Sequence, residues 1–535
     1  MTKHTKLHRI FLCGSLCLCH SGCGKEEQLA TMYLCSDTQE VNLKDEDGNS
    51  ITVPRGTAIQ MSDQETEEED NTVLIYLDER KLIVSKDMLV ENRDDCVRES
   101  LLYVNETVPA FESEDGFTFS EFVTYGQEVE IIGHSELLAD GSVEWYQTPS
   151  GYVYADHLSF TPIMDTMDYG AVHRDRNDLY GGGDAKDLDY TPHAKMDPVK
   201  AGVPEKISAI YLNGAAVSSI DSYIDAAVNG NVNAFVIDIK DADVIAVNAE
   251  TMQKYSPSSY QRAINTMDDY CTAVQKANDA GIYTIGRITV FKDTWYASDH
   301  PKHAIISSED GSLFELGGAL WPSAYSHDVW QYNAELAVEM AQKAGFDEIQ
   351  FDYVRFPESV DWYYDYLHAI DLRNTENISR VQAIQQFLLY ASEILHRHDI
   401  LISADVFGET SNAYVTAYGQ YWPAISNVTD AICAMPYPDH FSIHDYGIEQ
   451  AVWEVPHLLL TYWGEHVALR QQETTTPARV VTYIQGYDSL RPPYVIYDRE
   501  KIDEQIQGLK DGGIYDGHII WNSSSDLSRY ISYTQ

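Results

Sequence analysis

The sequence has few basic residues for its length. Its 36 lysines and arginines stand against 84 aspartates and glutamates, which leaves a formal net charge of −48 at pH 7. A protein that binds nucleic acid needs a basic surface to neutralise phosphates. The composition therefore argues against nucleic acid and phosphate-rich surfaces as partners. The simplest interpretation of the acidic excess is a solvated surface that keeps an exported protein soluble.

Signatures of metal and nucleotide sites are also missing. The four cysteines beyond the first 23 residues have no metal-ligand spacing, and no His-Glu-x-x-His motif occurs. His440 and His444 are four residues apart, but they fall in a loop expected to face solvent. The first strand of the C-terminal block leads into residues 213–216, Asn-Gly-Ala-Ala, which is not a glycine-rich phosphate turn. We therefore expect neither a metal nor a cofactor.

Four of the cysteines lie in the first 23 residues. Among the others, Cys35 and Cys96 could form a disulfide in an oxidising compartment, which the sequence alone does not decide. Cys433 lies inside an apolar strand and is expected in the core.

The N-terminus has no apolar run long enough to cross a bilayer comfortably. Basic residues precede a short apolar run from Ile10 to Cys19, which is the pattern of an export signal. Residues 21–23, Ser-Gly-Cys, resemble the end of a bacterial lipobox, with His20 where leucine is expected. We predict an export signal over residues 1–23 and an extracellular or cell-surface location. The sequence does not decide whether Cys23 is lipidated. A lipid at Cys23 is the one membrane attachment that the sequence suggests.

Two blocks precede the C-terminal one. Residues 35–160 contain short alternating strands with a faint internal repeat, which predicts small β modules over 35–97 and 98–160. The second copy, with Trp145-Tyr146 and a tight turn at 149–151, resembles a bacterial SH3-type barrel. That resemblance implies a spacer or binding to cell-wall peptidoglycan; a single irregular β domain is the alternative. Residues 161–204 are polar and turn-rich, as in a linker or extended strap.

The third block, residues 205–535, alternates apolar strands with amphipathic stretches. Eight strands are expected, at 207–213, 234–240, 283–290, 349–353, 401–407, 431–437, 480–485 and 518–522. Helical stretches are expected at 260–280, 329–344, 381–396 and 499–510. The size and order match an α/β fold of the (β/α)8 TIM-barrel type. A doubly wound sheet is the alternative.

Polar and aromatic residues collect near the carboxyl ends of these strands, where barrel enzymes keep their sites. The predicted substrate-binding residues are Asp238, Lys240, Arg287, Gln350, Tyr353, Arg355, Trp321, Tyr437, Gln485, Trp521 and Asn522. The loops after the third and fourth strands are long and contain aromatic residues at 295–296, 321–325 and 362–364. These rings could stack on sugar rings, although ordinary loop packing explains any single one of them equally well. Asp238 could also be a partner of Lys240 or a rival catalytic acid.

Asp352 and Asp405 are the predicted catalytic pair. They come from the fourth and fifth strands, whose ends can place two carboxyl groups about 5 Å apart, as in a retaining glycosidase. Asp352 is assigned as the nucleophile because Arg355 or Arg287 could hold it ionised. Asp405 lies among apolar neighbours that would raise its pKa, as an acid requires. The alternative is that either carboxylate only caps a loop or pairs with an arginine.

Four segments carry a family resemblance: residues 282–293, 321–325, 345–357 (GFDEIQFDYVRFP) and 402–408 (ISADVFG). Together with the closing strand, HIIWNSSS, they resemble a bacterial family of glycosyl hydrolase domains, domain of unknown function 4015. The resemblance spans the third block and implies a (β/α)8 barrel with Asp352 as nucleophile. The fifth-strand acid in such enzymes is usually Glu, whereas this chain has Asp405, with Glu409 four residues further on.

The sequence therefore predicts an exported glycoside hydrolase that acts on a cell-envelope or environmental polysaccharide by a two-carboxylate mechanism. The alternative is a non-catalytic, glycan-binding or wall-associated barrel, because one fold serves many functions. The sugar, the linkage and the stereochemical outcome are not determined by the sequence.

Overall fold

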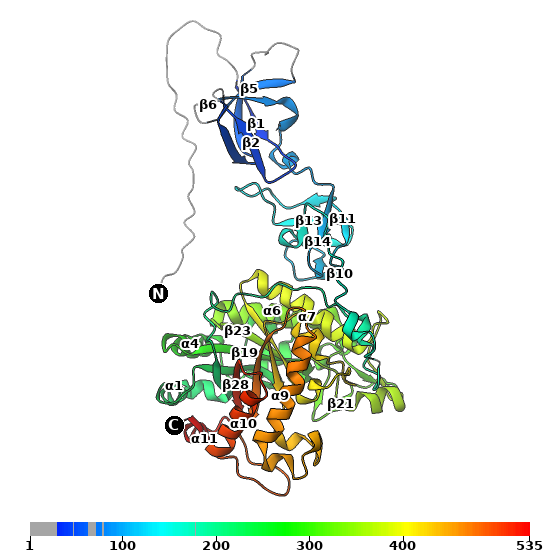
Figure 1. Cartoon of the computed structure of the whole chain (residues 1–535), viewed down its shortest axis with the longest axis vertical. Helices are drawn as coiled ribbons and strands as arrows, with labels where there is room; N and C mark the ends of the chain where they lie inside the picture. The colour runs from blue at the N-terminus through cyan, green and yellow to red at the C-terminus, as the bar shows by residue number, and fades with distance from the viewer. Residues whose placement is uncertain (1–28, 46–47, 63–70, 78–79, 177, 535) are drawn as a thin grey trace. The chain divides into compact units, whose positions relative to one another are not determined.

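The computed structural model describes residues 29–45, 48–62, 71–77, 80–176 and 178–534 (Figure 1). The predicted export signal and Cys23 lie outside these residues. The chain divides into two compact units, one formed by residues up to 99 together with 136–143, the other by 100–135 and 144–535. No helix in the described part of the chain is long and apolar enough to cross a membrane.

The first unit is a small antiparallel β structure. Its five-stranded sheet has the order β6-β5-β4-β1-β7, and β2 and β3 form a separate hairpin. The strands are β1 Leu29–Leu34, β2 Glu40–Lys44, β3 Ser50–Pro54, β4 Ala58–Ser62, β5 Thr72–Leu77, β6 Arg80–Ser85 and β7 Leu89–Val90. Alternate side chains of these strands form one apolar core that includes Leu34, Val41, Ile75 and Leu82.

The second unit begins with another antiparallel β module and ends with the barrel. The module consists of the sheets β10-β9-β14-β13-β12 and β11-β8-β15. Its strands are β8 Leu101–Val104, β9 Val108–Phe111, β10 Phe119–Val123, β11 Glu128–Glu130, β12 Gly133–His134, β13 Trp145–Thr148, β14 Gly151–Tyr154 and β15 Leu158–Ser159. The tight turn predicted at 149–151 joins β13 to β14, with Thr148 paired to Gly151.

Eight parallel strands close into the barrel, which confirms the predicted fold class. Their order is β16-β28-β27-β26-β25-β23-β19-β17, and pairing of β16 with β17 completes the ring. The strands are β16 Ile207–Leu212, β17 Ala234–Ala242, β19 Tyr283–Asp293, β23 Glu348–Asp352, β25 Leu401–Phe407, β26 Ala431–Met435, β27 Arg479–Gln485 and β28 Gly517–Trp521. Each lies within a few residues of its predicted position, because a buried parallel strand is a continuous apolar run.

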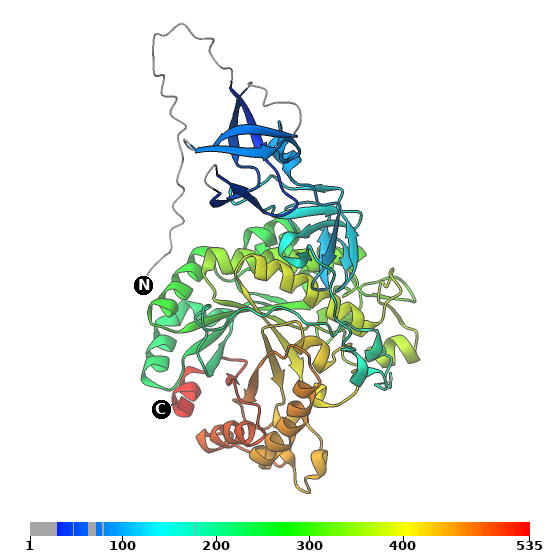
Figure 2. The ribbon, with the colours of Figure 1, turned by 45° about the horizontal axis from the view of Figure 1, so that its top comes forward.

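Helices lie outside the strands (Figures 1 and 2). They are α1 Ile220–Asn229, α2 Glu250–Tyr255, α3 Pro257–Arg262, α4 Met267–Asp279, α5 Thr294–Asp299, α6 His327–Glu339, α7 Arg380–Arg397, α8 Trp422–Ser426, α9 Pro456–Gln472, α10 Arg499–Asp511 and α11 Leu527–Thr534. The helix predicted over 260–280 is in fact two helices. Thr266 caps α4 in a reciprocal capping box with Asp269, so α4 starts there and the chain before it turns away.

The β module packs on α7 through aromatic and charged side chains. The Phe111 and Trp145 rings meet edge to face at 5.9 Å, and the Arg397 guanidinium lies 4.7 Å from the Trp145 ring centroid. The Tyr390 hydroxyl donates to the Phe117 carbonyl at 2.5 Å. These contacts join the module and the barrel in one apolar cluster.

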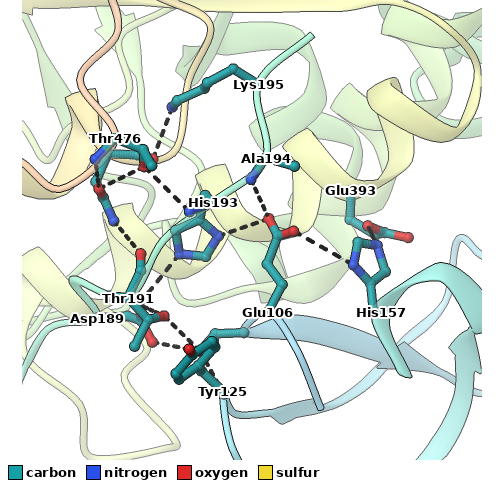
Figure 3. A network of polar contacts seen from close by, with 12 residues as sticks. Glu106, Tyr125, His157, Asp189, Thr191, His193, Ala194, Lys195, Glu393 and Thr476 are labelled. Carbon is teal, nitrogen blue, oxygen red and sulfur yellow. Dashed lines mark hydrogen bonds and ion pairs between the residues drawn. The ribbon is translucent and has the colours of Figure 1, made fainter. Parts of the chain in front are cut away.

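A polar network ties the module, the 161–204 segment and the barrel together (Figure 3). Glu106 lies between two histidines, with Oε1 3.1 Å from His193 Nδ1 and Oε2 3.7 Å from His157 Nδ1. The other His157 nitrogen lies 2.6 Å from Glu393 Oε2 on α7. Lys195, from the same segment as His193, donates to three backbone carbonyls of the barrel.

Because of this network, we expect the folded protein to become less stable at alkaline pH. Burial alone would lower the pKa of His157, but Glu393 and then Glu106 outweigh burial and raise that pKa to about 9. Because the folded pKa exceeds the unfolded value, the stabilisation is complete below about pH 6.5 and is lost as the pH rises through 9. We expect the free energy of unfolding to fall by roughly 2 kcal/mol across this range. The measurement is urea unfolding at a series of pH values.

His157→Gln is the control for this titration. It keeps a polar side chain but cannot become charged, so its pH dependence between 6.5 and 9 should be flatter than that of the parent protein. An identical pH dependence in both proteins would show that His157 is not the group responsible.

Candidate active site

Charged side chains from four neighbouring strands meet around Arg287. Arg287 Nη1 donates to Asp238 Oδ1 at 2.6 Å, while Nε at 3.1 Å and Nη2 donate to Asp352 Oδ2. Asp405 Oδ2 lies 3.7 Å from Arg287 Nε. Since Asp352 Oδ2 and Asp405 Oδ2 are both within 3.7 Å of one nitrogen, they are no more than about 7 Å apart, which is compatible with a glycosidase carboxyl pair.

The register of the barrel brings these groups close together, although Arg287 pairs with Gln350 and Asp352 with Thr289. Asp238 on β17 is the direct neighbour of Arg287 on β19, and Asp352 is the last residue of β23. Phe351 pairs with Ala404, so the next residues, Asp352 and Asp405, occupy the same layer of the barrel interior. A carboxyl group in such an interior is costly to desolvate, and here all three lie within 4 Å of one arginine.

The two predicted catalytic carboxyl groups have different surroundings. Asp352 is ion-paired with Arg287 and also accepts the Tyr353 backbone N–H at 2.5 Å. Asp405 is fully buried, and neither of its oxygens has a hydrogen-bond partner. Burial, followed by the charge of Asp352, raises the pKa of Asp405 well above its usual range. The buried position of Asp405 therefore favours its protonated form.

Asp238 is a third carboxyl group with a shifted pKa. Burial raises the pKa of Asp238 to about 7, although Arg287 opposes the shift. The Tyr211 hydroxyl donates to Asp238 Oδ2. Tyr211 follows Ile207 and Ala209 on the inward face of β16, so strand alternation could have identified it, although the sequence analysis did not.

Asp352 opens onto a cavity of about 160 Å³ above the strand ends. Its other lining residues are Arg287, Tyr353, Arg355, Phe407, Met435, Tyr437, His440, Tyr483 and Trp521. Tyr353 has a left-handed backbone with φ of 51°, which turns the chain sharply after Asp352. Asp405 and Asp238 do not line the cavity, and both contact Arg287 from the barrel interior.

A larger cavity of about 710 Å³ shares Phe407, Met435 and His440 with the first and so lies directly beside it. Its other lining residues are Gly408, Glu409, Asn412, Tyr414, Phe441, Asp445, Tyr446 and His466. The hydroxyls of Tyr414 and Tyr418 donate to the two Glu409 oxygens at 3.1 and 2.7 Å. His440, which the sequence analysis assigned to solvent, has an exposed side chain that nevertheless contributes to both cavities.

Several predicted substrate-binding residues do not reach the cavity. A register irregularity follows Asp238 on β17, and Lys240 then pairs with Asp293 at 2.5 Å and lies 4.7 Å from the Tyr332 ring on α6. Asp238 is therefore not the partner of Lys240. Arg355 does line the cavity, but it pairs with Glu358 and lies over the Phe407 ring, so of these two arginines it is Arg287 that pairs with Asp352.

The remaining predicted residues do not line the cavity and contact the residues or loops that surround it. Gln350 is buried one layer deeper and accepts the Tyr483 hydroxyl at 2.6 Å. Trp321 is fully buried with its ring edge-on to Tyr353. Gln485 and Asn522 hold loops together, because their amides donate to the Tyr487 and Gly486 carbonyls.

No group of three or more His, Cys, Asp or Glu residues among those described is arranged to hold a metal ion. The polar atoms of the cavity are instead those of an arginine-bound carboxylate, tyrosines and a histidine. Such an arrangement suits acid–base and nucleophilic chemistry at carboxyl groups.

The family described as "Putative glycosyl hydrolase domain" matches residues 209–527. The match covers more than half of the chain, and the chain belongs to this family. It includes most of β16, the other seven barrel strands in full and the cavity around Asp352. The fold and the family therefore define a (β/α)8-barrel domain of the glycosyl hydrolase type.

Several solved structures are similar to this chain. A hypothetical protein from Ruminiclostridium thermocellum is 31% identical over 37% of this chain and 97% of its own, with a TM-score of 0.31. The glycoside hydrolase domain of PgaB (BpsB) from Bordetella bronchiseptica is 13% identical, covering 62% and 99% of the two chains, with a TM-score of 0.43. A family 20 β-N-acetylhexosaminidase from Streptomyces coelicolor is 10% identical, covering 61% and 62%, with a TM-score of 0.40. A comparison with curated proteins found no match.

Proposed function

We propose that the protein hydrolyses a polysaccharide at the cavity around Asp352, with Asp352 as the nucleophile. The observation that carries this proposal is that an arginine-bound carboxylate and a buried carboxyl group with a raised pKa lie no more than about 7 Å apart. Asp352 attacks the anomeric carbon, and Asp405 donates a proton to the leaving oxygen. Because Asp405 does not line the cavity, this step requires Arg287 to move aside when the substrate binds. Asp405 then takes a proton from the water that releases the sugar from Asp352.

The larger cavity could hold further sugar units of the same substrate chain. It is adjacent to the Asp352 cavity, and its wall carries aromatic rings at Tyr414, Phe441 and Tyr446. Aromatic faces pack well against sugar rings, while Glu409 and Asp445 can accept hydrogen bonds from hydroxyls. We therefore favour a polymeric substrate over a short glycoside. The signal-like N-terminus supports action outside the cytoplasm, on an envelope or environmental glycan.

The test is incubation with a panel of bacterial and plant polysaccharides, with new reducing ends measured by mass spectrometry. Release of oligosaccharides from at least one polymer is the expected result. If a folded preparation releases nothing from any polymer but binds one of them, the non-catalytic, glycan-binding function is the correct one.

The acid is identified by comparing two carboxamide variants. Asp405→Asn should slow hydrolysis of the polymer by roughly 10²–10⁴-fold, the usual contribution of a general acid. A substrate with an activated aryl leaving group needs little protonation, so its hydrolysis should be much less affected. In the parent protein, the rate on the polymer should fall as the pH rises through the raised pKa of Asp405.

Glu409→Gln is the matched control, because Glu409 lines only the larger cavity and is bound by two tyrosine hydroxyls. Its rate should stay within severalfold of the parent rate. The reverse pattern, with a large loss in Glu409→Gln that an aryl leaving group rescues, would assign the acid to Glu409 and leave Asp405 a positioning role.

A further inference from the structure

Two buried thiols lie together in the first β unit. Cys35 directly follows β1, and Cys96 ends the short helical turn Arg93–Cys96; their exposed fractions are 1% and 0%. The Cys35 backbone N–H donates to the Met88 carbonyl at 2.7 Å, which fixes the end of β1 beside β7. The Cys96 thiol donates to the Leu34 carbonyl at 3.3 Å. The sulfur of Cys96 is thus held against the residue next to Cys35.

Both thiols are free in the structure and lie beside each other. Burial raises the pKa of the Cys96 thiol to about 12, and the neighbouring Cys35 side chain raises that pKa further. Backbone and side-chain contacts therefore place both thiols in one closed, apolar part of the unit. Cys271 and Cys433, the other two described cysteines, belong to the second unit.

We propose that Cys35 and Cys96 form a disulfide bond when the chain folds in an oxidising compartment. The oxidant is a small-molecule or protein disulfide. The two cysteine thiols lose two protons and two electrons as the new S–S bond forms, and the S–S bond of the oxidant breaks to give two thiols. The bond links the end of β1 to the last turn of the unit and closes a loop of about 60 residues, which restricts the unfolded chain strongly.

The burial of the pair determines when the bond forms. A thiolate is the attacking species in disulfide exchange, and a buried thiol with a raised pKa is rarely ionised. The folded, reduced protein should therefore react slowly with a disulfide oxidant. The same oxidant present during refolding should give the bond rapidly, because the thiols are then exposed.

The experiment uses the full-length chain, refolded in mixed oxidised and reduced glutathione and digested without reduction. We expect a linked pair of peptides containing Cys35 and Cys96, two hydrogen masses below the sum of the reduced peptides. In Cys35→Ser and Cys96→Ser the remaining partner should be alkylated, whereas Cys271→Ser, the matched control, should keep the linked pair. Recovery of Cys35 and Cys96 as free, alkylated thiols from the parent protein would overturn the proposal.

Hydrogen exchange gives a second, local measurement. Reduction of the oxidised parent should speed exchange of the β1 and β7 amides by at least about tenfold, because the unit opens more readily without the cross-link. Cys35→Ser and Cys96→Ser should show the fast exchange with or without reductant. Equal protection in the oxidised and reduced parent would show that no bond constrains these strands.

Discussion

Asp352→Asn is expected to reduce polysaccharide hydrolysis by at least about a thousandfold while leaving glycan binding in place. The amide keeps the shape of the side chain and can still accept a hydrogen bond from Arg287, but it cannot form the glycosyl ester. The cavity walls, including Tyr353, Tyr437 and Trp521, are unchanged by this substitution. Initial rates of reducing-end release, compared with binding isotherms for the same polymer, measure the effect.

The control for this variant is Glu358→Gln, which also removes one charge bound to an arginine near the cavity. Glu358 pairs with Arg355, and its side chain is 47% exposed. Its hydrolysis rate should remain within a few-fold of the parent rate. A comparable loss in both variants, or full activity in Asp352→Asn, would remove Asp352 from the nucleophile role.

The second large effect concerns stability. Replacing Arg287 by methionine keeps much of the side-chain volume but leaves Asp238, Asp352 and Asp405 without their shared cation. Removing one partner of a buried ion pair costs about 3–5 kcal/mol, because the charge that remains is buried and unpaired. We expect a loss of this size in the free energy of unfolding, measured by denaturant titration, and a loss of hydrolysis with it.

Two further variants distinguish the loss of stability caused by unpaired charge from the loss caused by altered packing. In Arg355→Met an equally buried arginine is lost, but its partner Glu358 can be solvated, so the expected loss is smaller. Adding Asp238→Asn to Arg287→Met removes one of the stranded carboxylates and should recover part of the stability. If the double variant is no more stable than Arg287→Met, electrostatic compensation is not the function of Arg287.

The pattern of apolar runs was sufficient to predict the barrel. All eight strands were predicted close to their observed bounds, since a strand buried on both sides is apolar throughout. Alternation also predicted that Asp352 and Asp405 point inward, because neighbouring side chains on a strand face opposite ways. Helix boundaries were less accurate: α9 was not predicted, and the cap at Thr266 divided one expected helix into two.

Side-chain contacts between different strands could not be predicted from the sequence. Lys240 has the same spacing from Asp238 as an inward residue would have, yet the irregularity on β17 sends it out to Asp293 and Tyr332. The choice of Arg287 over Arg355 as the partner of Asp352 depends on the register between β19 and β23. The sequence of one strand shows which of its side chains face the same way. Which strands lie beside it, and in which register they pair with it, is fixed only when the sheet closes into a barrel.

The local pattern of residues was therefore enough to predict the fold class, the family resemblance and two carboxyl groups to test. The folded barrel was needed to show that Asp352 faces the cavity, that Asp405 lies behind Arg287 with a raised pKa, and that a second cavity adjoins the first. The physical reason is that apolar periodicity is a local property of the chain, whereas burial, charge compensation and cavity shape arise from residues far apart in sequence that the barrel brings together.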